Sequence, residues 1–322
     1  MAEAARREPD NPALASAVAE MDEAAICTLH AFAQRILVEH ALAAGLPPSF
    51  DVLDELSERA DLEARLLRFT DQLLDDPGAE TMLLRGFLLG LGAPAMLEVA
   101  WCLHSQWDRL EDGALAGVEA ARPPPGSWPA LDVTPVAEAL ERALALAPLC
   151  TDPDDHLAKH LDERISAAIE VLGAAGDDEQ AALVFLARSP GFSSARGQAD
   201  NWQQRAAEVR QACADAETAR RALLAEASAP VVGEMLARLA RFTLEAAVAR
   251  VAEGRLTFHD LLVHARRLLR HDEGGRAALR RRYRWLLIDE FQDTDPVQWQ
   301  VIDRAFSGRS TVILIGDPKQ AI

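Results

Sequence analysis

Apolar residues recur at helical spacing through most of this chain of 322 residues. Between about residues 54 and 254, segment after segment carries apolar side chains three or four positions apart. Clear examples are residues 62–74, 95–107, 162–173 and 231–254. This spacing collects the apolar side chains on one face of a helix. One proline-rich stretch, residues 121–132, interrupts the pattern and is typical of a stiff surface connection.

The first part of the chain shows a shorter version of the same pattern. The apolar run at residues 25–28 predicts the end of a buried strand. A helix is predicted directly after it, because apolar side chains follow at helical spacing: Leu29, Phe32, Ala33, Ile36 and Leu37. Gly45, followed by Pro47 and Pro48, predicts the end of that helix.

Two further helices are predicted from their starting residues. Thr257 and Asp260 have the spacing of a capping box, in which each side chain bonds the other residue's backbone N–H. Asp295 is suited to cap a helix that begins with Pro296 and carries Gln298 at its third position. Apolar residues at helical spacing follow both starts.

Two continuous apolar runs, residues 285–288 and 311–315, have the length of strands and flank the second of these helices. Strands that are apolar on both faces occur in parallel sheets covered by helices. The connection between parallel strands is right-handed, and the residues that follow both strands then meet at one carboxyl edge. Acidic residues follow each run: Asp289 and Glu290 after the first, and Asp317 after the second.

Composition and charge narrow the class of protein. The chain is 49% hydrophobic and 26% charged, as globular proteins are, and carries a net charge of −18. That charge excludes a protein that coats nucleic acid by bulk charge, but it leaves room for a local basic site. Residues 255–322 hold 12 basic and 9 acidic side chains, so the acidity belongs to the first 254 residues. Two modules with different surfaces are therefore expected.

Several other features bear on location and partners. No apolar run reaches the roughly 20 residues that a membrane-spanning helix needs. The first residues lack the apolar core of a signal peptide, and the four cysteines are isolated. We therefore expect a cytoplasmic protein with no membrane partner.

The basic run from Arg280 to Arg284 admits two interpretations: a solvated face or partner contact, and a phosphate site.

The acidic residues at the predicted sheet edge have a specific use in nucleotide hydrolysis. The first carboxylate of an Asp–Glu pair after a strand can hold Mg²⁺, usually through water. The second can deprotonate an attacking water molecule. Asp289 and Glu290 fit those roles in that order. Carboxylates after strands also commonly cap the next turn, and the pair by itself does not separate these interpretations.

Longer strings around these residues resemble a known family. Residues 288–294, IDEFQDT, resemble motif II of superfamily 1 helicases of the UvrD/Rep type, and residues 316–322, GDPKQAI, resemble their motif III. Residues 28–32, TLHAF, resemble the family's T-x-H-x-F motif, and residues 257–262 resemble the segment before motif II. The motifs occur in the family's order. The strings DEFQDTDPVQW and TLHAFAQRIL look most like the RecB branch, the exonuclease V beta subunits, with the AddA and UvrD branches as alternatives.

The resemblance implies an α/β fold, namely a partial RecA-like P-loop NTPase domain with a parallel sheet and a large, mainly α-helical insertion. Residues 1–54 and 255–322 would be the two pieces of the RecA-like motor domain, and residues 55–254 the insertion. The resemblance also implies ATP and Mg²⁺ as cofactors. Its implied partners are single-stranded or duplex DNA and other subunits of a RecBCD-like complex.

The same resemblance implies roles for residues at the sheet edge. Asp289 would hold Mg²⁺ through water, and Glu290 would be the catalytic base. Gln292 would sense the γ-phosphate and the attacking water. Asp317 and Gln320 would bind the nucleotide and link its γ-phosphate to the DNA site.

The T-x-H-x-F motif implies contacts with the DNA strand from Thr28, His30 and Phe32. Taken alone, His30 would be an ordinary histidine at the start of a helix. Its place among the other motifs favours the DNA contact.

The sequence departs from the family in one respect. The family binds the triphosphate with a G-x-x-x-x-G-K-[ST] loop, and neither of the two lysines, Lys159 and Lys319, lies in one. We therefore expect a fragment of an ATP-dependent 3′→5′ DNA helicase of RecB type, inactive by itself, whose parent acts in double-strand-break repair and recombination. The alternative is a non-catalytic, helicase-derived binding module whose helical region binds a partner protein or DNA.

Overall fold

The structure is a computed structural model that describes residues 12, 24–124, 128, 130–317 and 319. The chain divides into two compact units. Residues 1–59 and 247–322 form one, called here the divided unit, and residues 60–246 form the other, the helical unit. These dividing points lie within eight residues of the predicted domain limits, 54/55 and 254/255. The assignment of the units to a motor domain and its insertion stays a prediction.

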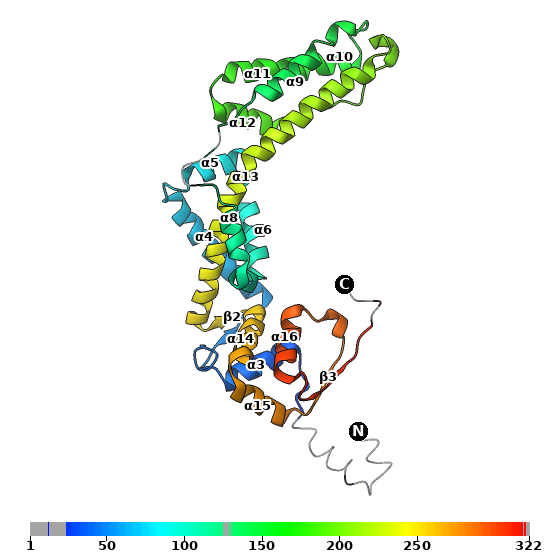
Figure 1. Ribbon diagram of the computed structural model, residues 1–322. Helices are drawn as coiled ribbons and strands as arrows, with labels where there is room; N and C mark the ends of the chain where they lie inside the picture. Colours follow the sequence, from blue (N-terminus) through cyan, green and yellow to red (C-terminus); the bar gives the residue numbers. More distant parts are fainter. Residues whose placement is uncertain (1–11, 13–23, 125–127, 129, 318, 320–322) are drawn as a thin grey trace. The chain divides into compact units, whose positions relative to one another are not determined.

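The divided unit mixes helices with short strands (Figure 1). Its elements are α3 (Leu29–Glu39), β1 (Asp51–Val52), β2 (Arg255–Leu256), α14 (Phe258–His271), α15 (Glu273–Arg282), β3 (Trp285–Ile288), η6 (Phe291–Asp293), α16 (Pro296–Phe306) and β4 (Thr311–Leu314). Both predicted capping boxes are present, at Thr257 with Asp260 and at Asp295 with Gln298. Local side-chain chemistry therefore sets where α14 and α16 begin.

Three helices build the core of the divided unit. α14 packs against both α3 and α16, and the buried faces are those that the apolar spacing predicts. The largest buried side chains on these faces include Ile36 of α3, Leu261 of α14 and Phe306 of α16. Each such side chain contributes about 1.5–3 kcal/mol by leaving water. The helices, more than the sheets, therefore hold the unit together.

The strands form two parallel sheets of two strands each. β1 pairs with β2, and β3 pairs with β4 in a register that sets Trp285 opposite Thr311 and Ile288 opposite Leu314. The predicted strand–helix–strand arrangement with parallel strands is thus confirmed for β3, α16 and β4.

Two expectations about the strands are wrong. Residues 25–28 form no strand, and Ile26 is 90% exposed, because Thr28 caps α3 at this point. Nor is β3 covered on both faces, since Trp285 and Leu287 are each 67% exposed while alternate residues face the core. Within the described residues, helices cover only one face of this two-stranded sheet.

A buried ion pair joins the end of α13 (Ala206–Glu253) to the start of α14. The Arg250 guanidinium donates to both carboxylate oxygens of Asp260, from Nε at 2.8 Å and from Nη2 at 2.9 Å. The two side chains are 1% and 0% exposed. Asp260 also accepts from the Thr257 backbone N–H at 3.0 Å. The Asp260 carboxylate therefore accepts a hydrogen bond at the start of α14 and also neutralises a buried cation. Removing Arg250 would leave this carboxylate buried without its cation.

The helical unit contains no strand within the described residues. Its elements are α4 (Glu55–Leu74), α5 (Glu80–Leu88), α6 (Ala93–His104), α7 (Trp107–Arg109), η2 (Leu110–Ala114), α8 (Leu115–Ala120), α9 (Thr134–Leu144), η3 (Ala147–Leu149), α10 (His156–His160), η4 (Leu161–Ser166), α11 (Ala167–Ala175), α12 (Glu179–Arg188), η5 (Ala199–Trp202) and α13. α13 is 48 residues long and continues through Pro230, so the segment 231–254, given above as an example of helical spacing, is the second half of a longer helix. Proline has no backbone N–H to donate to the preceding turn, so side-chain packing must stabilise the helix at Pro230.

Two apolar clusters lie along α13. One gathers α9, η4, α11 and α12 around Trp202, and the other gathers α4, α5 and α6 around Met235 and Phe242. Trp107 and Trp202 are buried, so these two rings pack inside the unit.

A single carboxylate organises the loops around the first cluster. Asp155 accepts hydrogen bonds from the N–H groups of Leu157 at 2.8 Å and Gln198 at 3.0 Å, and from the side chains of Asn201 and Trp202, each at 3.1 Å. Burial raises the pKa of Asp155, but these four donors outweigh burial and hold the pKa well below its ordinary value. The loops are therefore tied together by an ionised side chain.

Among the described residues, no single helix has both the length and the apolar composition to cross a membrane. The segments α5 and α6 meet those criteria only as a pair, which is bent by 109°.

We predict that Arg250→Met strongly destabilises the divided unit. The substitution leaves the Asp260 carboxylate buried without its cation, which costs about 3–5 kcal/mol. Urea unfolding, followed by hydrogen exchange of peptides from α14, measures the change. As a control, Glu39→Gln breaks the exposed Arg282–Glu39 ion pair and has little effect. Equal effects of the two substitutions would contradict the importance of the buried pair.

We also predict that α14 is less stable in mild acid. Burial lowers the pKa of His264 below 6.5; Asp260 partly opposes this shift and Arg250 adds to it. Because the unfolded chain takes up the proton first, stability is complete above about pH 6.5 and falls as the pH decreases toward the folded pKa. The measurement is the hydrogen-exchange protection of α14, corrected for intrinsic rates, at about pH 7.5 and about pH 5.5. His264→Gln reduces the loss of protection between the two pH values. An unchanged loss in this variant would rule out His264 as the source.

Candidate active site

The acidic residues predicted at the sheet edge lie on two segments that are hydrogen-bonded to each other. Ile288 and Leu314, the last residues of β3 and β4, are partners across the sheet. Backbone hydrogen bonds extend the contact beyond the strands, from Ile315 N–H to the Ile288 carbonyl at 2.8 Å and from Phe291 N–H to the Ile315 carbonyl at 2.9 Å. The segment that follows β3 is therefore held against the segment that follows β4.

The side-chain amide of Gln292 joins these two segments. Its Nε2 donates to Glu290 Oε2 at 2.5 Å, and its Oε1 accepts from the Asp317 backbone N–H at 3.0 Å. Both ends of the amide are thus used, one on each segment. One side chain therefore links the Glu290 carboxylate to the backbone at Asp317.

Glu290 itself has an unusual backbone. Its φ of 51° and ψ of 43° lie in the left-handed region, which costs a residue with a Cβ atom roughly 1–2 kcal/mol. The Glu290 N–H donates to Asp289 Oδ1 at 3.0 Å. This conformation turns the chain sharply after β3 and leaves both carboxylates exposed. Backbone strain of this kind is concentrated at functional sites.

Gly316 permits the close approach of the two segments, a role that its sequence context did not suggest. A Cβ atom on Gly316 would lie 2.7 Å from Gln292 Oε1 and 3.3 Å from the backbone nitrogens of Phe291 and Gln292. Those distances are too short for any side chain unless Gln292 moves. The available signal was a glycine placed directly after a strand, which often marks close approach of another segment.

The carboxylates suit a magnesium–nucleotide complex. Within the described part of the chain, no group of three or more His, Cys, Asp or Glu side chains is placed to hold a metal ion. Mg²⁺ usually keeps several waters and binds through one or two carboxylates plus phosphate oxygens, so a single exposed ligand such as Asp289 fits it. The Lys319 N–H donates to Asp317 Oδ1 at 2.9 Å, while Gln320 lies outside the described residues.

The three residues of the T-x-H-x-F motif have different environments. Thr28 is exposed and caps α3, with its hydroxyl accepting from the Ala31 N–H at 3.2 Å. Phe32 is only 8% exposed and packs in the core against the rings of Tyr283 and Phe306. The contact of these residues with DNA stays a prediction. Phe32 also has a structural role, because its ring belongs to the core.

His30 links the motif to the start of α14. Its ring packs edge-on against Phe258, with centroids 5.4 Å apart. Burial lowers the pKa of His30, Asp295 opposes the shift and His259 adds to it. The ring is therefore neutral near pH 7 and can both donate and accept a hydrogen bond.

Comparison of the sequence with known proteins identifies the family. The profile of the UvrD/REP helicase N-terminal domain matches residues 2–322. The chain belongs to the UvrD/REP helicase family. Membership implies a RecA-like α/β fold and the use of ATP and Mg²⁺ within the family, so the resemblance seen in the motifs is confirmed.

Individual relatives match shorter stretches of this UvrD/REP helicase domain. The RecBCD enzyme subunit RecB of Mycolicibacterium smegmatis is 53% identical over 79 residues, 24% of this chain and 7% of the relative. RecB of Escherichia coli is 44% identical over 73 residues, 21% of this chain and 6% of the relative. A probable DNA helicase II homologue of Mycoplasma genitalium is 32% identical over 73 residues, which are 23% of this chain and 10% of the relative. The chain spans a tenth or less of these relatives' lengths.

We predict that Gly316→Ala displaces the Gln292 side chain and releases the Asp317 N–H. Hydrogen exchange at this amide, measured by NMR, accelerates about fivefold, the equivalent of one lost hydrogen bond of about 1 kcal/mol. Gln292→Ala gives the same acceleration, and the double variant goes no further because both changes break one interaction. Gly117→Ala, in open space on α8, leaves the amide unchanged. Additive effects would argue against a contact between Gly316 and Gln292.

Proposed function

We propose that this chain is part of an ATP-dependent DNA helicase of the RecB type. Such a protein would move 3′→5′ along single-stranded DNA and act in DNA repair and recombination. The observation that carries the proposal is the Gln292 amide, which joins Glu290 to the backbone at Asp317. The stretches shared with proteins named RecBCD enzyme subunit RecB support the branch.

Each residue at the sheet edge has a different role in ATP hydrolysis. Asp289 would hold the magnesium ion of Mg–ATP through water, and the nucleotide would supply the phosphoanhydride that water cleaves. Glu290 accepts a proton from that water. Gln292 donates to one oxygen of the Glu290 carboxylate, which orients the carboxylate and leaves its other oxygen for the water. The position of the base thus depends on the neighbouring amide.

The same amide provides a route from the nucleotide to DNA. A shift of Glu290 during hydrolysis moves Gln292, and with it the segment that carries Asp317 and continues to Gln320. Thr28 and His30 present polar groups for the DNA strand, while Phe32 fixes their helix to the core. The coupling needs an element with two arrangements, and the strained turn at Glu290 is suited to that.

Binding of the triphosphate requires groups beyond the residues at the sheet edge. The 322 residues contain no G-x-x-x-x-G-K-[ST] loop, so a phosphate-binding loop from outside this sequence would complete the site. The chain by itself would then not hydrolyse ATP. Other subunits of a RecBCD-like complex are proposed as partners. The missing loop also favours a second candidate, a helicase-derived module that binds a partner protein or DNA without catalysis.

We predict that Glu290→Gln in the intact protein lowers DNA-stimulated ATP hydrolysis roughly 100- to 10,000-fold, because the water loses its base. Binding of ATP and of DNA is retained, since the substitution preserves the size of the side chain. Steady-state turnover with and without single-stranded DNA is the measurement, and Glu273→Gln on α15 is a matched control with normal turnover. An intact protein that shows no turnover would favour the non-catalytic module, and turnover indifferent to Glu290 would rule out Glu290 as the base.

A further inference from the structure

The turn that carries Glu290 is too short to hold its shape by itself. η6 is a single 3₁₀ turn of three residues, Phe291–Asp293, and it follows Glu290 in its left-handed conformation, with a φ of 51°. One turn of helix fixes several backbone dihedral angles for few hydrogen bonds, so it is unfavourable in isolation. The conformation of Glu290 therefore depends on contacts made from outside the turn.

The segment after β4 restrains this turn on one side. The Phe291 N–H donates to the Ile315 carbonyl at 2.9 Å. The Gln292 amide accepts from the Asp317 backbone N–H at 3.0 Å. These two contacts fix the backbone of Phe291 and the side chain of Gln292, and they leave the Phe291 ring to be restrained by something else.

The ring of Phe291 packs against a second aromatic side chain, Trp299 of α16. The ring centroids are 5.4 Å apart and the ring planes are inclined by 79°, which is the edge-to-face arrangement that aromatic pairs favour. Both side chains are partly buried against the core of the divided unit. The turn is therefore held between the segment after β4 and the side of α16.

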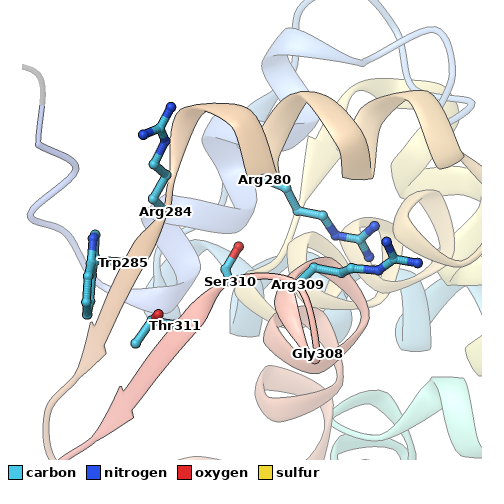
Figure 2. Close-up of a pocket in the computed structure, with 7 residues that line it drawn as sticks. All are labelled: Arg280, Arg284, Trp285, Gly308, Arg309, Ser310 and Thr311. Carbon is cyan, nitrogen blue, oxygen red and sulfur yellow. The ribbon is translucent and has the colours of Figure 1, made fainter.

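α16 is a fixed support for this contact. Its first turn is closed by the capping box of Asp295 and Gln298. At its other end, the Arg280 guanidinium of α15 donates from Nε to the Ala305 carbonyl at 2.7 Å. Figure 2 shows the Arg280 side chain extending from α15 toward the end of α16. Trp299 thus stands on a helix whose two ends are both anchored.

The ring contact and the left-handed turn depend on each other. A rotation about φ or ψ of Glu290 swings the residue that follows it, so Phe291 meets Trp299 only near the observed conformation. The contact in turn opposes relaxation of Glu290, because an edge-to-face pair is comparable in strength with the cost of a left-handed residue that has a Cβ atom. The Glu290 carboxylate is thereby held exposed beyond the end of β3.

We propose that Trp299 is a positioning residue for ATP hydrolysis, which acts by holding the Phe291 ring and, through it, the backbone of Glu290. This role rests on the proposed function, in which Glu290 is the base. The Trp299 ring contacts Phe291, so it acts through the turn and not on the nucleotide. Loss of the ring contact therefore slows the chemical step without weakening nucleotide binding.

The first test compares two substitutions of Trp299 in the intact protein. Trp299→Phe keeps a ring opposite Phe291, whereas Trp299→Leu removes it, and both reduce the side-chain volume. At saturating single-stranded DNA, Trp299→Leu lowers kcat for ATP hydrolysis about fivefold, as for the loss of one aromatic pair, while Trp299→Phe stays within about twofold of wild type. The KM for ATP changes less than about twofold in both variants. Equal losses of kcat in the two variants, or a change confined to KM, would overturn the proposal.

The second test measures the turn directly and needs no turnover. Hydrogen exchange of the nucleotide-free protein, followed by mass spectrometry, accelerates about fivefold in Trp299→Leu for peptides that contain residues 290–294. Peptides of α14 keep the wild-type rate. Equal acceleration in both regions would mean that Trp299 only stabilises the unit as a whole, and no acceleration would mean that the contact does not hold the turn. Either result overturns the proposal.

Phe69→Leu is the matched control for the loss of an aromatic pair elsewhere. Phe69 packs against Phe242 in the helical unit, with ring centroids 4.8 Å apart, and it is partly buried, as Trp299 is. This substitution leaves both kcat and the exchange of residues 290–294 unchanged. A loss equal to that of Trp299→Leu would overturn the proposal.

The variant Glu290→Gln separates this role from the proposed function. In that background Trp299→Leu causes no further loss of turnover, because the base that it would misplace is already absent. A further fivefold loss, as in the wild-type background, would overturn the proposal. Normal turnover of Glu290→Gln itself would instead contradict the proposed function, and the exchange measurement decides separately whether Trp299 holds the turn.

Discussion

The parallel register of β3 and β4 is the constraint on which the candidate active site depends. By setting Ile288 opposite Leu314, it brings the acidic residues after the two strands to one edge. The same register sets Trp285 opposite Thr311 at the other edge, where Arg284 and Arg309 also lie. A slip of one residue would turn alternate side chains to the wrong face and separate Gln292 from its partners. One short ladder thus places negative charge at one end and positive charge at the other.

A ladder of two strands cannot hold its register alone, because isolated pairs of strands are marginally stable in water. The support comes from α3, α14 and α16, whose buried faces form a continuous core with Leu286 and Ile288 of β3. The start of α14 is held in turn by the buried Arg250–Asp260 pair. The geometry of exposed polar residues therefore rests on apolar packing and one desolvated ion pair.

The T-x-H-x-F segment shows how one short motif can serve two purposes. Phe32 lies in the core, Thr28 caps a helix, and His30 packs on the ring of Phe258. The motif is thus tied to the segment that precedes the acidic pair. Any DNA contact made by Thr28 or His30 would act on a helix that is fixed to the core by Phe32.

The sequence by itself determined features that depend on near neighbours in the chain. Four features follow from local spacing and strand direction: the caps of α14 and α16, the buried faces of the helices, the parallel β3 and β4, and the meeting of the segments that carry Asp289 and Asp317. Only the tertiary structure decided the rest, namely the bridge made by the Gln292 amide and the left-handed turn at Glu290. Each of these depends on segments brought together in space, so no spacing along the chain encodes it.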